Sequence, residues 1–204
     1  MSIFNRYATE LNDIATSVFR DYTEAKQTLE EAKHNKEMTN PYDRIAMVKA
    51  IMAVEEAEAS FKNAKANLEN GGKRLEKVRE DLSNAISEEY TSKPESVDSK
   101  AIELLKSGTM TGKDYEWMYN RAYEADNHTM VKIIGHYAEN DERCNEQSKV
   151  GESLRKIIHG AKNDNGHEYL EAFDTLCGVY KRTANNPLMI EVWDGLTAEL
   201  VEEF

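Results

Sequence analysis

Cysteine, proline and glycine are all scarce in this chain of 204 residues, which contains 2, 3 and 10 of them. The two cysteines, Cys144 and Cys177, lie far apart and neither belongs to a CxxC pair, so the sequence does not indicate a disulfide framework. Few helix breakers and 31% charged residues favour long helices with exposed faces. Alternating β-branched runs between regular turns are also lacking, and we therefore predict an all-α fold.

Long apolar runs are missing as well. No segment approaches the length of a membrane-spanning helix. The first residues, MSIFNRYATELND, include polar and acidic side chains where a secretory signal needs a continuous apolar core. We therefore expect a cytoplasmic protein that has no membrane partner.

Basic residues are outnumbered, because the formal net charge is −12 and the acidic excess is larger after residue 92 than before it. The densest basic stretch, residues 73–79, is interleaved with Glu76 and followed by Glu80, which is typical of a solvated helix face. Affinity for nucleic acid comes mostly from clustered Lys and Arg. The sequence therefore predicts no nucleic-acid partner.

A regular apolar pattern fills the first part of the chain. Apolar residues recur three and four positions apart through residues 2–37, and again from Met47 to Ala85, which predicts two helices with facing seams. The break between them contains Asn40-Pro41, typical of a turn in which Asn40 caps the next helix. We predict that residues 1–92 form a long antiparallel coiled-coil hairpin with its turn at 38–42.

Two features of the second helix suggest a function: a pair of glycines in its interior and an apolar stretch near its end. Gly71 and Gly72 lie in its interior, where each glycine costs about 1 kcal/mol, so a bend at 70–72 or a hinge is predicted there. Replacing both by alanine is expected to stabilise the helix unless they adopt positive φ. Because this helix outruns its partner, its distal apolar residues need a cover from either the C-terminal part or a second copy of the chain. We predict a possible interaction surface there at Leu82, Ile86 and Tyr90.

After a polar linker at 91–97, residues 93–204 are predicted to form an acidic domain of shorter helices. Capping signals predict helices at 97–106, 112–125, 166–184 and 187–203, with further helical segments within 127–160. Trp117 and Trp193 are expected in the core, with a recognition anchor as the alternative for each.

Candidate chemistry is sparse. Glu124, His128 and Lys132 lie one turn apart, with His136 two turns beyond His128, but the second ligand pair of a zinc or di-iron site is missing. We interpret this set as a solvated face. No activated nucleophile, phosphate-binding loop or calcium loop is recognisable. Neither a metal nor a cofactor is therefore expected.

The sequence favours a non-enzymatic structural or protein-interaction protein that uses the hairpin for assembly or docking, with a protein partner or a second copy of itself in a homo-oligomer. Its composition is similar to that of bacterial and phage scaffolding or assembly proteins. Two alternatives stay open. One is a small acidic regulatory or inhibitory binder, and the other is an enzyme whose site lies between helices.

Overall fold

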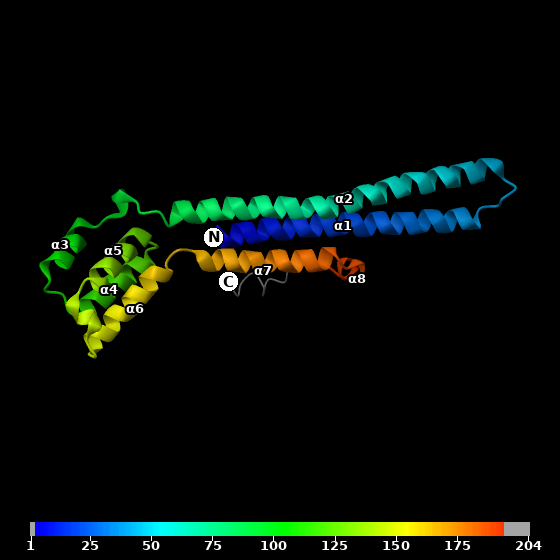
Figure 1. The fold of residues 1–204 in the computed structure, drawn as a ribbon. Helices are drawn as coiled ribbons and strands as arrows, with labels where there is room; N and C mark the ends of the chain where they lie inside the picture. Colours follow the sequence, from blue (N-terminus) through cyan, green and yellow to red (C-terminus); the bar gives the residue numbers. More distant parts are fainter. Residues whose placement is uncertain (1–2, 194–204) are drawn as a thin grey trace. The chain divides into compact units, whose positions relative to one another are not determined.

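The computed structural model describes residues 3–193. Within that range the chain forms helices and no strand, which confirms the all-α fold (Figure 1). The long helices are α1 (Ile3–Met38) and α2 (Arg44–Glu89). The shorter ones are α3 (Ser99–Ser107), α4 (Gly112–Glu124), α5 (His128–Glu139), α6 (Lys149–Asn163), α7 (His167–Ala184) and α8 (Pro187–Glu191), with 3₁₀ turns at Pro94–Ser96 and Glu142–Asn145.

The predicted antiparallel helical hairpin is confirmed in α1 and α2. The Tyr22 and Phe61 rings, one from each helix, lie with their centres 5.3 Å apart. The cap of α2 differs from the prediction, because the Asp43 carboxylate accepts hydrogen bonds from the backbone N–H groups of Ile45 and Ala46 at 3.1 and 3.0 Å. Asn40 instead accepts from the Tyr42 N–H inside the turn. The hairpin turn therefore uses both polar residues, and α2 begins after Asp43.

The contacts divide the chain into two compact units. One, the hairpin unit, comprises residues 1–82 and 169–204; the other, the cluster unit, comprises residues 83–168. The sequence predicts a division at residues 92–93 instead. The end of α2 contributes Ile86 and Tyr90 to the cluster unit, where both lie close to Gly166, while most of α7 packs in the hairpin unit.

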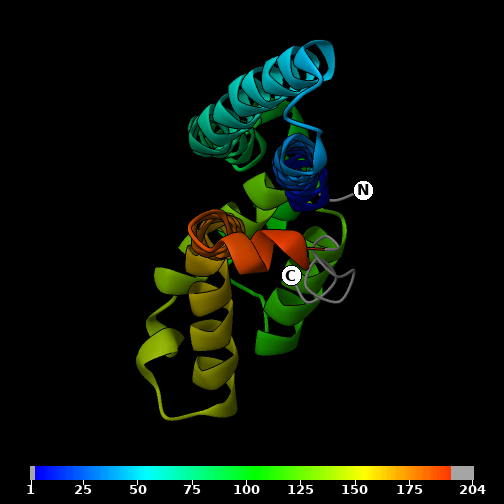
Figure 2. The same ribbon diagram turned by 90° about the vertical axis from the view of Figure 1, so that its right-hand side faces the viewer.

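In the hairpin unit, α7 lies alongside the hairpin (Figures 1 and 2). The Tyr180 ring stacks on Phe19 of α1 with 5.2 Å between ring centres. The Arg79 guanidinium of α2 binds the Asp174 carboxylate through two hydrogen bonds of 2.6 and 2.8 Å. Both partners of this ion pair are about half exposed, so it contributes little stability and chiefly fixes the register of α7.

Helix α2 runs through Gly71 and Gly72 without interruption, and neither residue has a positive φ. A Cβ atom at Gly71 would lie 2.1 Å from the Tyr180 hydroxyl oxygen, whereas one at Gly72 would meet nothing within 4 Å. The Tyr180 hydroxyl also donates to the Leu68 carbonyl oxygen at 2.9 Å. Gly71 therefore makes room for a buried tyrosine, and this close contact argues against the hinge predicted at Gly71 and Gly72.

The cluster unit has its own core, formed mainly by α4, α5 and α6. A Cβ atom at Gly135 of α5 would lie 2.3 Å from the Ala161 Cβ, so these two helices cross in close contact. Local caps hold the helix starts. Thr111 and Asp114 form a capping box at the start of α4, and Asp98 caps α3, which begins two residues later than the predicted helix 97–106. Core side chains include Leu105, Tyr115, Met118, Met130, Val131, Ile134, Leu154 and Ile157.

Helix α8 begins at Pro187 and is capped by Asn186, as predicted, but it ends at Glu191. The remainder of the predicted helix 187–203 from residue 194 onward lies outside the described residues. Trp193 is half-buried. Its ring meets Phe19 edge-on with 5.0 Å between ring centres, in agreement with the expected packing role.

Candidate functional site

Trp117 on α4 does not pack in the core, and 60% of its surface is exposed. The core-facing side of α4 is taken by Tyr115, Met118 and Ala122. Because a helix repeats every 3.6 residues, Trp117 and Arg121 share the neighbouring face, one turn apart. The predicted core position of Trp117 is therefore wrong, and the recognition-anchor alternative gains support.

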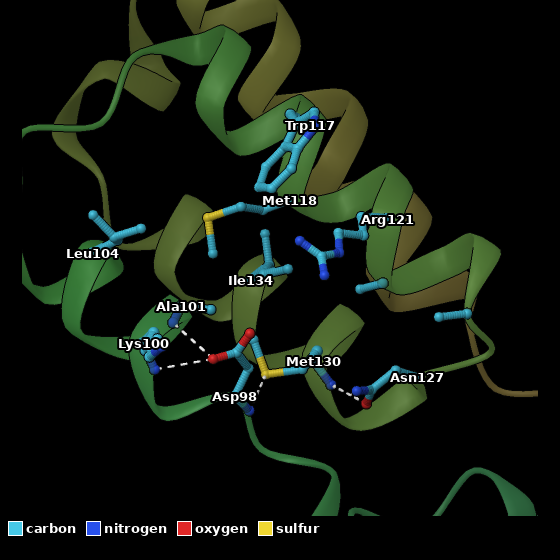
Figure 3. A pocket seen from close by; sticks show the side chains of 12 residues that line it. Asp98, Lys100, Ala101, Leu104, Trp117, Met118, Arg121, Asn127, Met130 and Ile134 are labelled. Carbon is cyan, nitrogen blue, oxygen red and sulfur yellow. Dashed lines mark hydrogen bonds between the residues drawn. The ribbon is translucent and has the colours of Figure 1, made fainter.

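Beside Trp117 lies an apolar groove of about 510 Å³, formed by α3, α4 and α5 (Figure 3). Met118, Met130 and Ile134 form its base, and all three belong to the core of the cluster unit. Trp117 and the exposed Leu104 stand at its edges. Methionine side chains adapt their shape to different apolar partners, which suits a docking surface.

Cations border the groove. The Arg121 guanidinium carbon lies 5.4 Å from the centre of the Trp117 ring, a cation–π arrangement, and Lys100 is exposed on α3. The negative charge of Asp98 is engaged at the start of α3, where its carboxylate accepts from the N–H groups of Lys100 and Ala101 at 3.0 and 3.2 Å. The groove therefore presents an apolar base bordered by two exposed cations, Lys100 and Arg121, and by the Asp98 carboxylate that caps α3.

The backbone around the groove is held in place by specific hydrogen bonds. The Asn127 side chain caps α5 by accepting from the Met130 N–H at 3.0 Å, and its amide donates to the Ser96 carbonyl oxygen at 2.9 Å. The Asp98 N–H also contacts the Met130 sulfur at 3.4 Å. These bonds join the start of α5 to the segment before α3, so the groove does not depend on a ligand for its shape.

A second polar feature of the cluster unit is a hydrogen-bonded pair between α5 and the end of α6. The His128 Nδ1 atom lies 2.9 and 3.0 Å from the two Asp164 oxygens, and Asp164 is 8% exposed. The Tyr90 ring packs 4.0 Å from the imidazole, centre to centre, while Lys132 donates to the Tyr90 carbonyl oxygen. Burial and the charge of Asp164 raise the pKa of nearby Tyr119.

These contacts change the interpretation of Glu124, His128, Lys132 and His136. Glu124 ends α4 and His128 begins α5, so they do not share one helix face. The solvated-face interpretation is wrong for His128, which is largely buried against Asp164. Glu124 and His136 are exposed. Within residues 3–193 no group of three or more His, Cys, Asp or Glu side chains is arranged to hold a metal.

The surface predicted at Leu82, Ile86 and Tyr90 is covered by the chain itself. Leu82 is completely buried and Ile86 nearly so. Tyr90 is half-buried beside His128. These residues are packed within the fold, and none of them offers a broad exposed surface to a partner. The sequence indicates that they need a cover and leaves open whether the C-terminal part of the chain or a second copy supplies it, and the structure shows all three packed within one chain.

The cysteines are both free. Cys144 is buried, and burial raises the pKa of the half-buried Cys177 thiol to about 11. At neutral pH Cys177 is therefore a protonated thiol and a poor nucleophile. Neither cysteine has the electropositive, accessible surroundings of a reactive one.

The sequence carries one signal for the groove beside Trp117, because Trp117 and Arg121 fall one turn apart and off the apolar stripe of their helix.

No helix in the described part of the chain is both long and apolar enough to span a membrane. Comparisons with protein-family models, curated proteins and solved structures found no match to this chain.

Proposed function

We propose that the chain is a non-enzymatic interaction protein whose cluster unit docks an amphipathic helix of a partner protein in the groove beside Trp117. The observation that carries this proposal is the exposed Trp117 ring at the edge of an open apolar groove. Amphipathic helices commonly bind by laying their apolar face into such grooves. Tryptophan and arginine are also the residues most enriched among those that dominate binding energy.

The border of the groove indicates the charge of the partner. Arg121 and Lys100 favour acidic side chains beside the apolar face of the docked helix, even though the chain as a whole carries a net charge of −12. The two free cysteines fit a reducing compartment, which supports the cytoplasmic location included in this proposal. The expected partner is thus a cytoplasmic protein that presents an acidic, amphipathic helix.

A displayed library of helical peptides, selected on the purified protein, tests the groove. We expect the selected peptides to combine Leu, Ile or Phe at helical spacing with Glu or Asp. Trp117→Ala should weaken their binding by about 2 kcal/mol or more, roughly thirtyfold, because it removes the main apolar anchor. Isothermal titration calorimetry with one selected peptide measures the difference.

Tyr123→Ala is the matched control, because Tyr123 is equally exposed on α4 but does not line the groove. It should leave the affinity within about twofold of the unaltered protein. Arg121→Glu should weaken the acidic peptides and leave neutral ones less affected. Equal losses for Trp117→Ala and Tyr123→Ala would place the peptides elsewhere and count against the groove.

A further inference from the structure

The turn end of the hairpin exposes more large apolar side chains than any other part of the described chain. Tyr42 is 91% exposed and Ile45 73%. Val48, Ile51 and Met52 of α2 are also exposed, as is Met38 at the end of α1. Exposed apolar residues are ordinary when scattered, but a contiguous group of this kind marks an interaction surface.

The start of α2, from Ile45 to Val54, has the composition of a helix that is buried on all sides. Every residue from Ile45 to Val54 is apolar except Lys49. A helix that is apolar all round is normally buried all round. Here α1 covers only one face: Val54 is buried, and Met47 and Ala50 are half-buried, while the opposite face is left to solvent.

The other described helices of the hairpin unit, α7 and α8, do not reach this face. Helix α8 is tied to α1 at Lys26, through its ion pair with Glu191. The turn lies about three helical turns further along α1. Figure 1 shows the turn end extending beyond α7 and α8. Within residues 3–193, therefore, no other helix covers Ile45, Val48 and Met52, which we call the tip stripe, and a second molecule can pack against them.

The charged residues beside the tip stripe indicate which kind of molecule packs against it. Arg44 and Glu55 lie about three turns apart on one flank of the stripe, and Lys49 and Glu56 lie two turns apart on the other. Each flank therefore runs from positive to negative along α2. Two such helices placed side by side and antiparallel, with Val48 level with Met52, bring Arg44 of each helix close to Glu55 of the other, whereas parallel helices would bring Glu55 close to Glu56.

We infer that the tip stripe is the contact between two copies of this chain, whose α2 helices pair antiparallel around a two-fold axis. Val48 of one copy then lies level with Met52 of the other, and Arg44 lies within one residue of the level of Glu55. Such an interface is self-complementary, as two-fold symmetry requires. The inference rests on the proposed function only in treating the chain as an interaction protein, since it concerns a different surface from the groove.

Sedimentation equilibrium of the full chain tests this pairing. The unaltered protein should form a dimer, and Ile45→Asp with Met52→Asp should give a monomer of unchanged helicity, because both side chains are exposed within a single copy. Leu188→Asp on α8 is the matched control, since Leu188 is equally exposed but lies away from the tip stripe. It should dimerise like the unaltered protein.

A charge exchange tests the antiparallel alignment. Arg44→Glu and Glu55→Arg should each weaken the dimer by about tenfold, and the chain carrying both should recover most of the loss. If the unaltered protein is a monomer, the inference is overturned, even if the tip stripe of that monomer binds lipid vesicles or another protein. So does a dimer that keeps its affinity in the Ile45/Met52 variant, or a charge exchange that fails to restore it. Trp117→Ala should not alter the dimer, so the two proposals fail independently.

Discussion

Replacing Gly71 by alanine should lower the free energy of unfolding of the hairpin unit, while the same change at Gly72 should raise it. The new Cβ at Gly71 would lie 2.1 Å from the Tyr180 hydroxyl oxygen, a distance that forces Tyr180 to move. Overpacking of this kind costs about 1–3 kcal/mol. At Gly72 no atom lies within 4 Å, so alanine gains about 1 kcal/mol of helix propensity without a clash.

Urea unfolding followed by circular dichroism measures both changes. Tyr180→Phe removes the hydroxyl that the new Cβ meets, along with its hydrogen bond to Leu68. Combining it with Gly71→Ala should therefore cost less than the sum of the two single changes, by about 0.5–3 kcal/mol. If Gly71→Ala raised the free energy of unfolding, Tyr180 would not pack against this glycine. That result would support the hinge predicted at Gly71 and Gly72.

Replacing Asp164 by alanine should have the largest effect on the cluster unit. The change leaves the largely buried His128 ring without the carboxylate that both of its short contacts reach. An unsatisfied buried polar group costs about 1–3 kcal/mol. We therefore expect a loss of about 1–3 kcal/mol.

Thermal or urea unfolding of the full chain, followed through the near-ultraviolet signal, reports this loss. Asn163→Ala, at the exposed neighbouring position, should change stability by no more than about 0.5 kcal/mol. Replacing both partners, as His128→Phe with Asp164→Leu, should recover much of the loss, because apolar side chains often substitute for a buried pair. An Asp164→Ala protein of undiminished stability would mean that His128 is well solvated.

Local sequence patterns predict the positions of most helices correctly. The three-and-four spacing of apolar residues indicates α1 and α2, and the Asn40-Pro41 break indicates the turn between them. The capping box of Thr111 and Asp114 and the cap at Asn186 are also recognisable, because a cap depends only on the backbone of the next few residues. The same patterns say nothing about which helix covers which apolar face.

The functional surfaces were harder to foresee for that reason. Leu82 and Ile86 extend beyond the shorter helix of the hairpin, and the sequence does not decide between a second copy and the rest of the chain as their cover; the fold buries both. The apolar area of tryptophan predicts a core position for Trp117, yet the other side of α4 faces the core. In both cases the outcome depends on contacts between residues far apart in sequence, which composition and spacing do not encode.

The sequence by itself determined that the chain is all-helical, where most helices begin, and that its first two helices pair as a hairpin, because hydrophobic periodicity and capping act within a few turns. Tertiary structure alone decided that Gly71 accommodates Tyr180, that His128 pairs with Asp164, and that the open apolar surfaces lie beside Trp117 and at the hairpin turn. These features arise where separate helices meet or fail to meet, and burial is a property of the whole packed chain.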